Sequence, residues 1–112
     1  MSQSEPMVIQ DHDMEIIKEN AEKAASLLKA LANKQRLMIL CNLARGEMSV
    51  STLNQQLDLS QSALSQHLAR LRQDELVLTR REAQTIFYSL KPGLASQIIE
   101  MFYQHYCVEG EG

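Results

Sequence analysis

The chain has 112 residues, 45% of them hydrophobic and 22% charged, which is the size and composition of one globular domain. Its formal net charge of −3 argues, taken alone, against a nucleic-acid partner. No apolar run approaches the ~18 residues that span a bilayer, and the first residues lack the basic and apolar regions of a secretory signal, so we expect a cytoplasmic protein with no membrane partner.

The charge is unevenly distributed along the chain. Residues 1–22 contain six acidic residues and one Lys, and residues 92–112 contain three acidic residues and no base. Residues 23–91 contain ten basic and five acidic residues, so the acidic ends hide a basic centre. This asymmetry is compatible with a nucleic-acid partner, although charge runs more often form solvated faces.

The first part of the chain predicts a tail and two helices. Residues 1–12 are expected to form a flexible tail, and apolar residues then recur at helical spacing from Asp13 to Leu31. Asn33 predicts the N-cap of a second helix, which Gly46 ends.

Two further helices follow, with a short link between them. Ser49 predicts the N-cap of a helix that reaches Leu57, and Asp58 suits the left-handed conformation expected to end it. Ser60 predicts the N-cap of the next helix, which ends near Asp74. Two helices joined by about three residues indicate a helix-turn-helix unit.

The pattern changes in "LVLTRREAQTIFYSLK", where β-branched and aromatic residues alternate roughly and predict a hairpin of strands 77–82 and 85–90. Pro92 suits the first turn of a last helix, and residues 108–112 are expected to form a second flexible tail. The predicted fold is therefore mainly α with a β-hairpin: a winged helix-turn-helix domain over residues 13–107, in the order helix-helix-helix-helix-strand-strand-helix. The last helix has two adjacent apolar rows, Leu94, Ile98 and Met101 in one and Ile99, Phe102 and Tyr106 in the other. One row is expected to face the core of the domain and the other a partner chain.

The fourth helix, in "LSQSALSQHLARLRQ", has an unusual outward face. Its leucines at 64, 68 and 71 share one face, while the opposite face has uncharged donors and acceptors, and residues 61–73 contain no carboxylate. Gln can pair with adenine, Ser with several base edges, and Ala with a thymine methyl group. The alternative is a Ser-capped helix with a mildly polar surface. The DNA-binding residues predicted on this helix are Gln61, Ser62, Ser65, Gln66, Ala69 and Arg70.

Four residues at or beside the hairpin turn complete the predicted DNA-binding surface: Arg80, Arg81, Gln84 and Thr85. From a hairpin tip such side chains reach phosphates or the minor groove. The alternative is a pair of arginines that keeps an edge strand soluble. One helix of this length reads only a few base pairs, so we expect a homodimer, formed through the first and last helices, on a palindromic site in double-stranded DNA. The alternative is a monomer with a large hydrophobic core.

About residues 27–90 resemble the ArsR family of winged-helix regulators, most specifically in "RLMIL", "LSQSALSQHLARLR" and "REAQTIFYSL". The resemblance implies a homodimer built from the first and last helices, with the fourth helix in the major groove. Metal sensing is the best-known activity of the family, but "EMSVSTL" has Ser49 and Ser51 where the arsenic site has thiolates, and hydroxyls bind soft metals poorly. The zinc sites of the last helix need several ligands, and here His105 stands alone, so no metal site is expected.

Two cysteines remain, Cys41 in "ILCNL" and Cys107 in "YQHYC". By themselves they are expected to be buried thiols in a reducing compartment. Their placement resembles the dithiol subgroup of the family, of the hemolysin-regulator and biofilm-regulator type. That resemblance implies redox sensing of reactive sulfur species or oxidants, through a disulfide or polysulfide bridge between Cys41 and Cys107. Such a sensor needs no cofactor, and the alternative is a pair of inert thiols.

Catalysis is the least expected function. The sequence contains no Gly-rich phosphate loop, no H-E-x-x-H motif and no plausible set of nucleophile, base and acid, so we expect no enzyme. The sequence therefore predicts a dimeric DNA-binding transcriptional regulator with a dithiol switch. The alternatives are a metal-responsive regulator with an unrecognised site and a protein-interaction adaptor on the same fold.

Overall fold

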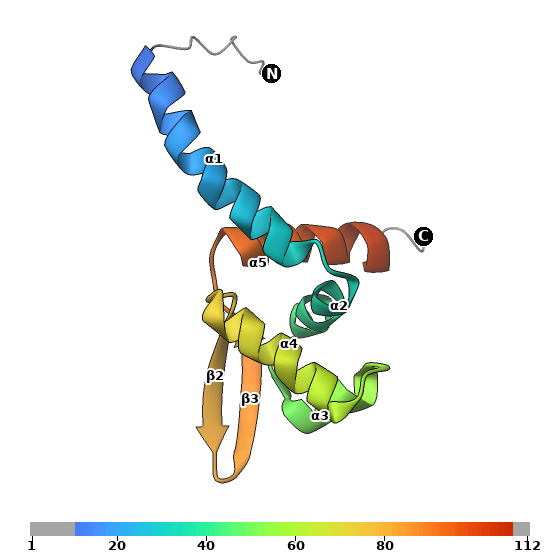
Figure 1. Cartoon of the computed structure of the whole chain (residues 1–112). Coiled ribbons are helices and arrows are strands. Elements are labelled where there is room, and N and C mark those ends of the chain that lie inside the picture. The colour runs from blue at the N-terminus through green and yellow to red at the C-terminus, as the bar shows by residue number, and fades with distance from the viewer. Residues whose placement is uncertain (1–10, 109–112) are drawn as a thin grey trace.

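The computed structural model describes residues 11–108, with side chains from Asp13 onward. Figure 1 shows a body of short helices and one sheet, from which a long first helix extends at one end and a hairpin at the other. The helices are α1 (Asp11–Leu31), α2 (Lys34–Leu43), α3 (Val50–Gln56), α4 (Gln61–Gln73) and α5 (Leu94–Tyr103), which continues into a π-helical segment, η1 (Gln104–Val108). The strands are β1 (Met48–Ser49), β2 (Val77–Glu82) and β3 (Thr85–Leu90).

Side-chain caps begin three of the helices at the predicted residues. The Asn33 carboxamide oxygen accepts a hydrogen bond from the backbone N–H of Arg36 at 2.9 Å. The Ser49 and Ser60 hydroxyls each accept one, at 3.1 Å, from the N–H groups of Thr52 and Ala63. Each cap satisfies a backbone donor that has no partner within its helix, so these local signals set where α2, α3 and α4 begin.

The hairpin has the predicted strand limits, and α3 and α4 precede it, so the predicted winged helix-turn-helix fold is confirmed. The sheet, however, has three antiparallel strands in the order β1-β3-β2. The expectation of only two strands is therefore wrong, because Met48 and Ser49 form a third strand that pairs with Tyr88 and Phe87 of β3. A two-residue strand carries no alternation that a sequence could reveal.

Three local expectations also need correction. The residue that ends α3 is Leu57, in an extended conformation, and Asp58 does not have a positive φ. Pro92 lies before Gly93, the N-cap of α5, rather than within its first turn. The first helix begins at Asp11 instead of Asp13, and η1 ends at Val108; residues 1–10 and 109–112, which form most of the expected tails, lie outside the described residues.

The core lies between α2, α3, α4, β3 and α5. Its fully buried large side chains are Ile39, Leu40, Leu53, Leu64, Leu71 and Ile99. In α5 the buried face takes Ile99 from one predicted apolar row and packs Ile98 from the other, so neither row alone faces the core as expected. Only the last turns of α1 join the core, through Ala30 and Leu31. No described helix combines the length and apolar character required to cross a membrane.

Candidate nucleic-acid interface

The outward face of α4 is exposed along its whole length. Leu64, Leu68 and Leu71 are 0–2% exposed and fix the helix against the core, which confirms the predicted core stripe. The opposite side is open to solvent, as the predicted DNA-binding role requires: Gln61, Ser62, Ser65, Gln66, Ala69 and Arg70 are all exposed.

A side-chain hydrogen bond and a buried leucine stabilise the link between α3 and α4. The Asn54 side chain donates to the backbone carbonyl of Leu59 at 3.0 Å, across the link between the two helices. The buried Leu57 closes the same link from the core side. A helix-turn-helix held in this way presents the outward face of α4 on a rigid support, which sequence reading needs.

The predicted cationic contacts differ in their present partners. Arg70 is paired with Asp74, one turn later on the same helix, at 2.9 Å. Arg80 is paired with Glu47 at 2.8 Å. Arg81 is exposed and forms no hydrogen bond or ion pair with any residue from 13 to 108. Of these three guanidinium groups, Arg81 is therefore the one already available to a phosphate.

A polar notch of about 540 Å³ joins α3, the start of α4 and the tip of the hairpin. It contains the predicted residues Gln61, Gln84 and Thr85, so the structure brings the start of α4 and the hairpin tip together. It also contains three polar residues of α3 that the sequence analysis did not select, although "STLNQQ" has the same amide-rich character as α4. The notch is lined by Val50, Ser51, Asn54, Gln55, Gln61, Gln84, Thr85 and Ile86, none of which is charged.

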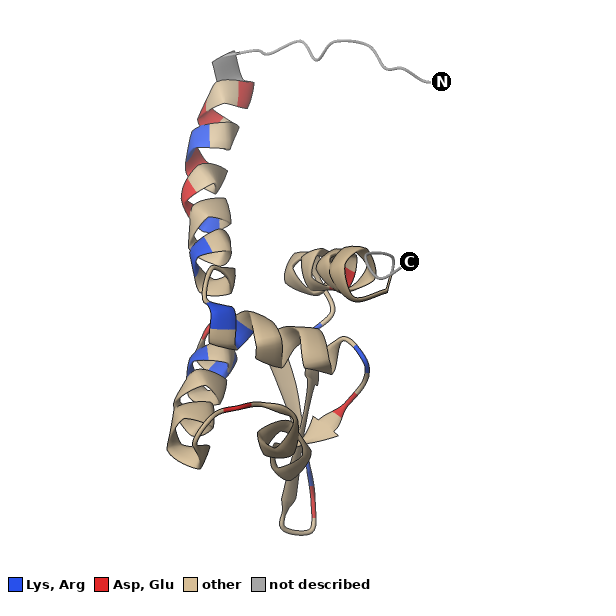
Figure 2. Cartoon of the chain, turned by 90° about the vertical axis from the view of Figure 1, so that its right-hand side faces the viewer, with Lys and Arg blue, Asp and Glu red and all other residues tan. Residues whose placement is uncertain are grey.

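The charge of the chain is unevenly distributed in space as well as along the sequence. Figure 2 shows the acidic residues of α1 gathered toward its free end, where Lys18 lies among them, and the other Lys and Arg residues nearer the body. The basic centre of the sequence is therefore separated in space from the acidic start of α1. A negative net charge is then compatible with a locally favourable surface for DNA.

A second site lies where α2 meets the end of the chain. A dithiol pocket of about 360 Å³ is lined by Cys41, Asn42 and Arg45 of α2 and by Tyr103 and Cys107 from the last helix. Both thiols are free; Cys41 is half-buried and Cys107 is exposed. Burial raises the pKa of the Cys41 thiol above its ordinary value, and the charge of the nearby Cys107 raises it further. The two cysteines, 66 residues apart in sequence, thus share one pocket.

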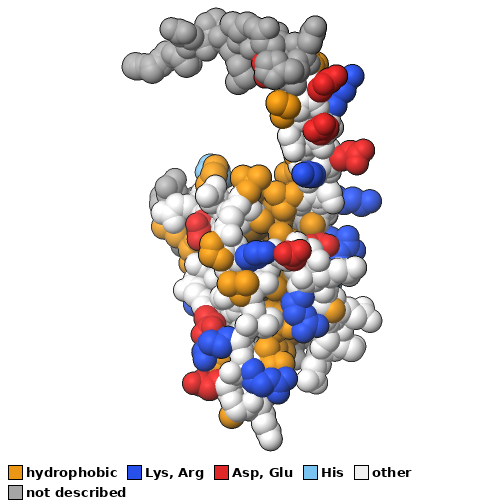
Figure 3. Space-filling view, turned by 90° about the vertical axis from the view of Figure 1, so that its left-hand side faces the viewer, with side chains coloured by type: hydrophobic (Ala, Val, Ile, Leu, Met, Phe, Trp, Pro, Cys, Tyr) orange, Lys and Arg blue, Asp and Glu red, His pale blue; other side chains and the backbone are white. Residues whose placement is uncertain are grey.

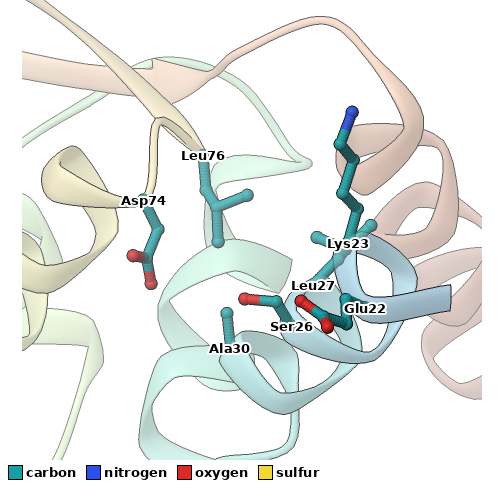
Figure 4. A pocket seen from close by; sticks show the side chains of 7 residues that line it. All are labelled: Glu22, Lys23, Ser26, Leu27, Ala30, Asp74 and Leu76. Atoms are coloured by element: carbon teal, nitrogen blue, oxygen red, sulfur yellow. The ribbon is translucent and has the colours of Figure 1, made fainter. Parts of the chain in front are cut away.

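Beyond these two sites, the described residues bear on the predicted absence of a metal site and form a further hollow. Among residues whose side chains are placed, no group of three His, Cys, Asp or Glu could hold a metal ion. Figure 4 shows another hollow, between α1 and the end of α4, lined by Glu22, Ser26 and Asp74 among others. It shares no residue with the polar notch or the dithiol pocket.

Comparison with known proteins agrees with this geometry. Residues 33–79 match the family described as "Bacterial regulatory protein, arsR family". The chain is 51% identical over 102 residues to the transcriptional activator HlyU of Vibrio cholerae serotype O1, covering 91% of this chain and 90% of that protein. It is 42% identical over 106 residues to the biofilm growth-associated repressor of Agrobacterium fabrum, covering 95% and 91%.

A solved structure shows the same fold. The crystal structure of HlyU from Vibrio vulnificus CMCP6 superposes with a TM-score of 0.80 at 50% identity, covering 85% of this chain and 99% of that one. These relatives are described as a transcriptional activator and a repressor. The resemblance seen in the sequence is thereby confirmed: the chain belongs to the ArsR family of bacterial regulatory proteins, and it is a DNA-binding transcriptional regulator with a winged helix-turn-helix fold.

Proposed function

We propose that the protein is a cytoplasmic homodimer that reads a palindromic operator with α4 and the hairpin, and that the dithiol pocket switches this activity. The observation that carries the first part is the outward face of α4, which is exposed, uncharged for most of its length and free of carboxylates. Carboxylates at such a position would be repelled by phosphate, whereas Ser and Gln can pair with base edges.

The contacts divide between bases and backbone. Gln61, Ser62, Ser65, Gln66 and Ala69 face base edges in the major groove. From the hairpin tip, Arg81, Gln84 and Thr85 reach phosphates or the minor groove, and Arg70 reaches a phosphate once it leaves Asp74. Arg80 differs from Arg70 because two of its guanidinium nitrogens donate to the two carboxylate oxygens of Glu47.

Exposed apolar residues on α1 and α5 support a dimer formed through these two helices. Leu28 of α1 is 58% exposed and Met101 of α5 is 68% exposed. Figure 3 shows hydrophobic side chains gathered along the line where α1 meets the body. A symmetric partner that covers both helices would remove this surface from water and place two copies of α4 on the same face of DNA.

The switch is an exchange between the two thiols and a sulfur oxidant. One thiolate attacks hydrogen disulfide (HSSH), forming Cys–S–SH and releasing HS⁻. The second thiolate attacks the protein-bound sulfur of that persulfide, forming the Cys41–Cys107 disulfide and releasing a second HS⁻. The two thiols lose two electrons, which reduce the sulfur oxidant to hydrosulfide. The pocket that the two free thiols share supports the proposal.

A selection for bound duplex DNA, run on reduced and on polysulfide-treated protein, tests both parts. We expect one palindromic sequence to be enriched by the reduced protein and enrichment to change after treatment. Mass spectrometry of the treated protein should show Cys41 linked to Cys107, directly or through added sulfur. Two unmodified thiols after treatment would end the switch, and failure to enrich any sequence would end α4 as a reader.

A further inference from the structure

Arg80 is held in the most elaborate side-chain arrangement on the hairpin. Its Nη2 and Nε atoms donate to the two carboxylate oxygens of Glu47 at 2.8 and 3.0 Å. Its guanidinium carbon also lies 4.6 Å from the centre of the Phe87 ring. A bidentate pair on an aromatic face fixes an arginine in both position and orientation, unlike most surface ion pairs.

The strand register places this arrangement across all three strands. Phe87 of β3 is paired with Arg80 on one side and with Ser49 of β1 on the other. Paired residues share a face of the sheet, and the next residue of β3, Tyr88, is buried on the opposite face, against the helices. The Glu47–Arg80 pair therefore lies on the outer face of the sheet.

Arg81 has the reverse placement. Successive side chains of a strand point to opposite faces, so Arg81 shares the helix-side face with its partner Ile86, which lines the polar notch.

Arg80 also has a second carboxylate nearby, with Glu82 at 3.7 Å. Two carboxylates beside one guanidinium group oppose the approach of a phosphate to it.

We propose that Arg80 is a positioning residue, which holds the hairpin at a fixed angle to α3, and that Arg81 supplies the phosphate contact. Glu47, Arg80 and Phe87 form a strap from β2 across β3 to the residue before β1. Ser49 at the end of β1 is the N-cap of α3, so the strap joins the hairpin to the first turn of the helix-turn-helix. It thereby sets the shape of the polar notch. The role of Arg81 as a phosphate contact rests on the proposed DNA interface, whereas the positioning role of Arg80 does not.

Hydrogen exchange of the free protein tests the strap without DNA. Glu47→Gln and Arg80→Gln should each speed exchange of the β2 and β3 backbone amides by about two- to fivefold, the most that a surface pair of this kind supports. The reversed pair, Glu47→Arg with Arg80→Glu, restores the ion pair but neither the stacking on Phe87 nor the attraction to Glu82, so it should slow exchange only part of the way back to wild type. Unchanged exchange in both single variants would overturn the strap.

The salt dependence of binding to a fixed duplex recovered by selection tests the division of roles. Losing one phosphate contact per subunit lowers the slope of log K against log salt by about 1.8 for a dimer. Arg81→Gln should show this loss, while Arg80→Gln should weaken binding with the slope unchanged, and the reversed pair should regain part of the affinity. An equal loss of slope in Arg80→Gln would overturn the assignment. If no duplex binds, the proposed function fails and the exchange measurement alone decides the strap.

Discussion

Glu75 ends α4 in a conformation that its side chain disfavours. Its φ is 58°, and the N–H groups of Glu75 and Leu76 donate to the carbonyls of Arg72 and Leu71 at 3.0 Å each. This is the Schellman arrangement, in which the residue in the left-handed conformation is usually Gly. The buried Leu71 and Leu76 hold it in place, so tertiary packing outweighs the local preference of Glu75.

The strain at Glu75 predicts a gain in stability from glycine. Glu75→Gly should be about 1 kcal/mol more stable than Glu75→Ala, because both lose the exposed ion pair with Lys91 and only the first relieves the left-handed backbone. Urea denaturation of the two variants measures the difference directly. Equal midpoints would show that the backbone at this position is not strained.

The raised pKa of Cys41 predicts a difference between the two thiols. The thiolate is the reactive form, so at pH 8 Cys41 should react with iodoacetamide more slowly than an ordinary thiol and more slowly than the exposed Cys107. Cys107→Ser should lower the pKa of Cys41 only in part, since the larger cause, burial, remains. Alkylation rates against pH, followed by mass spectrometry, give both results. A Cys41 that titrates below the ordinary thiol range would contradict this account.

At the scale of elements, α4 has one face buried in the core, with Leu64, Leu68 and Leu71, and an opposite, exposed face that is proposed to read DNA. Ser65→Ala with Gln66→Ala should leave folding intact and reduce preference for the selected duplex over a scrambled one by about tenfold or more, since a good base contact supplies about 1–3 kcal/mol of discrimination. Competition binding measures the preference.

The opposite face of α4 provides the control. Leu64→Ala should lower the free energy of unfolding by about 2–5 kcal/mol, because Leu64 is 0% exposed, while the surviving folded protein keeps its sequence preference. If the Ser65 and Gln66 double variant retains wild-type preference, α4 is not the reader.

The sequence predicts the elements whose signals are local. The side chains of Asn33, Ser49 and Ser60 each bond to a backbone N–H three residues later, and the residue types of the hairpin alternate along its own strands. The sequence therefore predicts the starts of these helices and the limits of the strands correctly. The missed features depend on distant partners. β1 exists because β3 lies beside it, and Glu47 is 33 residues away from Arg80. The predicted rows of α5 fail because a helical wheel does not say which neighbours cover the helix.

The sites follow the same division. The exposed face of α4 was predictable because one amphipathic pattern fixes both of its sides. The polar notch was not, because it needs the relative placement of α3 and the hairpin tip, and the α3 residues Ser51, Asn54 and Gln55 become visible only there. The dithiol pocket was implied by resemblance alone, and spacing in the sequence could not have placed Cys41 beside Cys107.

At the scale of the whole molecule, α1 lies mostly outside the body, and its exposed apolar residues predict association. Leu28→Glu with Met101→Glu should weaken the dimer at least about tenfold, because a buried unpaired charge strongly opposes an apolar interface. Sedimentation equilibrium measures the change. Leu78→Glu, at an apolar residue of the hairpin that is 46% exposed, is the matched control and should leave the mass unchanged. A wild-type protein that sediments as one chain would contradict the proposed dimer.

The neutral reading face also affects how the protein searches a chromosome. Random DNA retains a protein mainly through phosphate contacts by cations, and here two of the three arginines predicted to contact DNA, Arg70 and Arg80, are held by carboxylates of the same chain. Contacts by Ser and Gln are gained only when the right bases are present. We therefore expect brief residence on unrelated sequences and a small fraction of molecules sequestered there, so that even a scarce regulator finds its site.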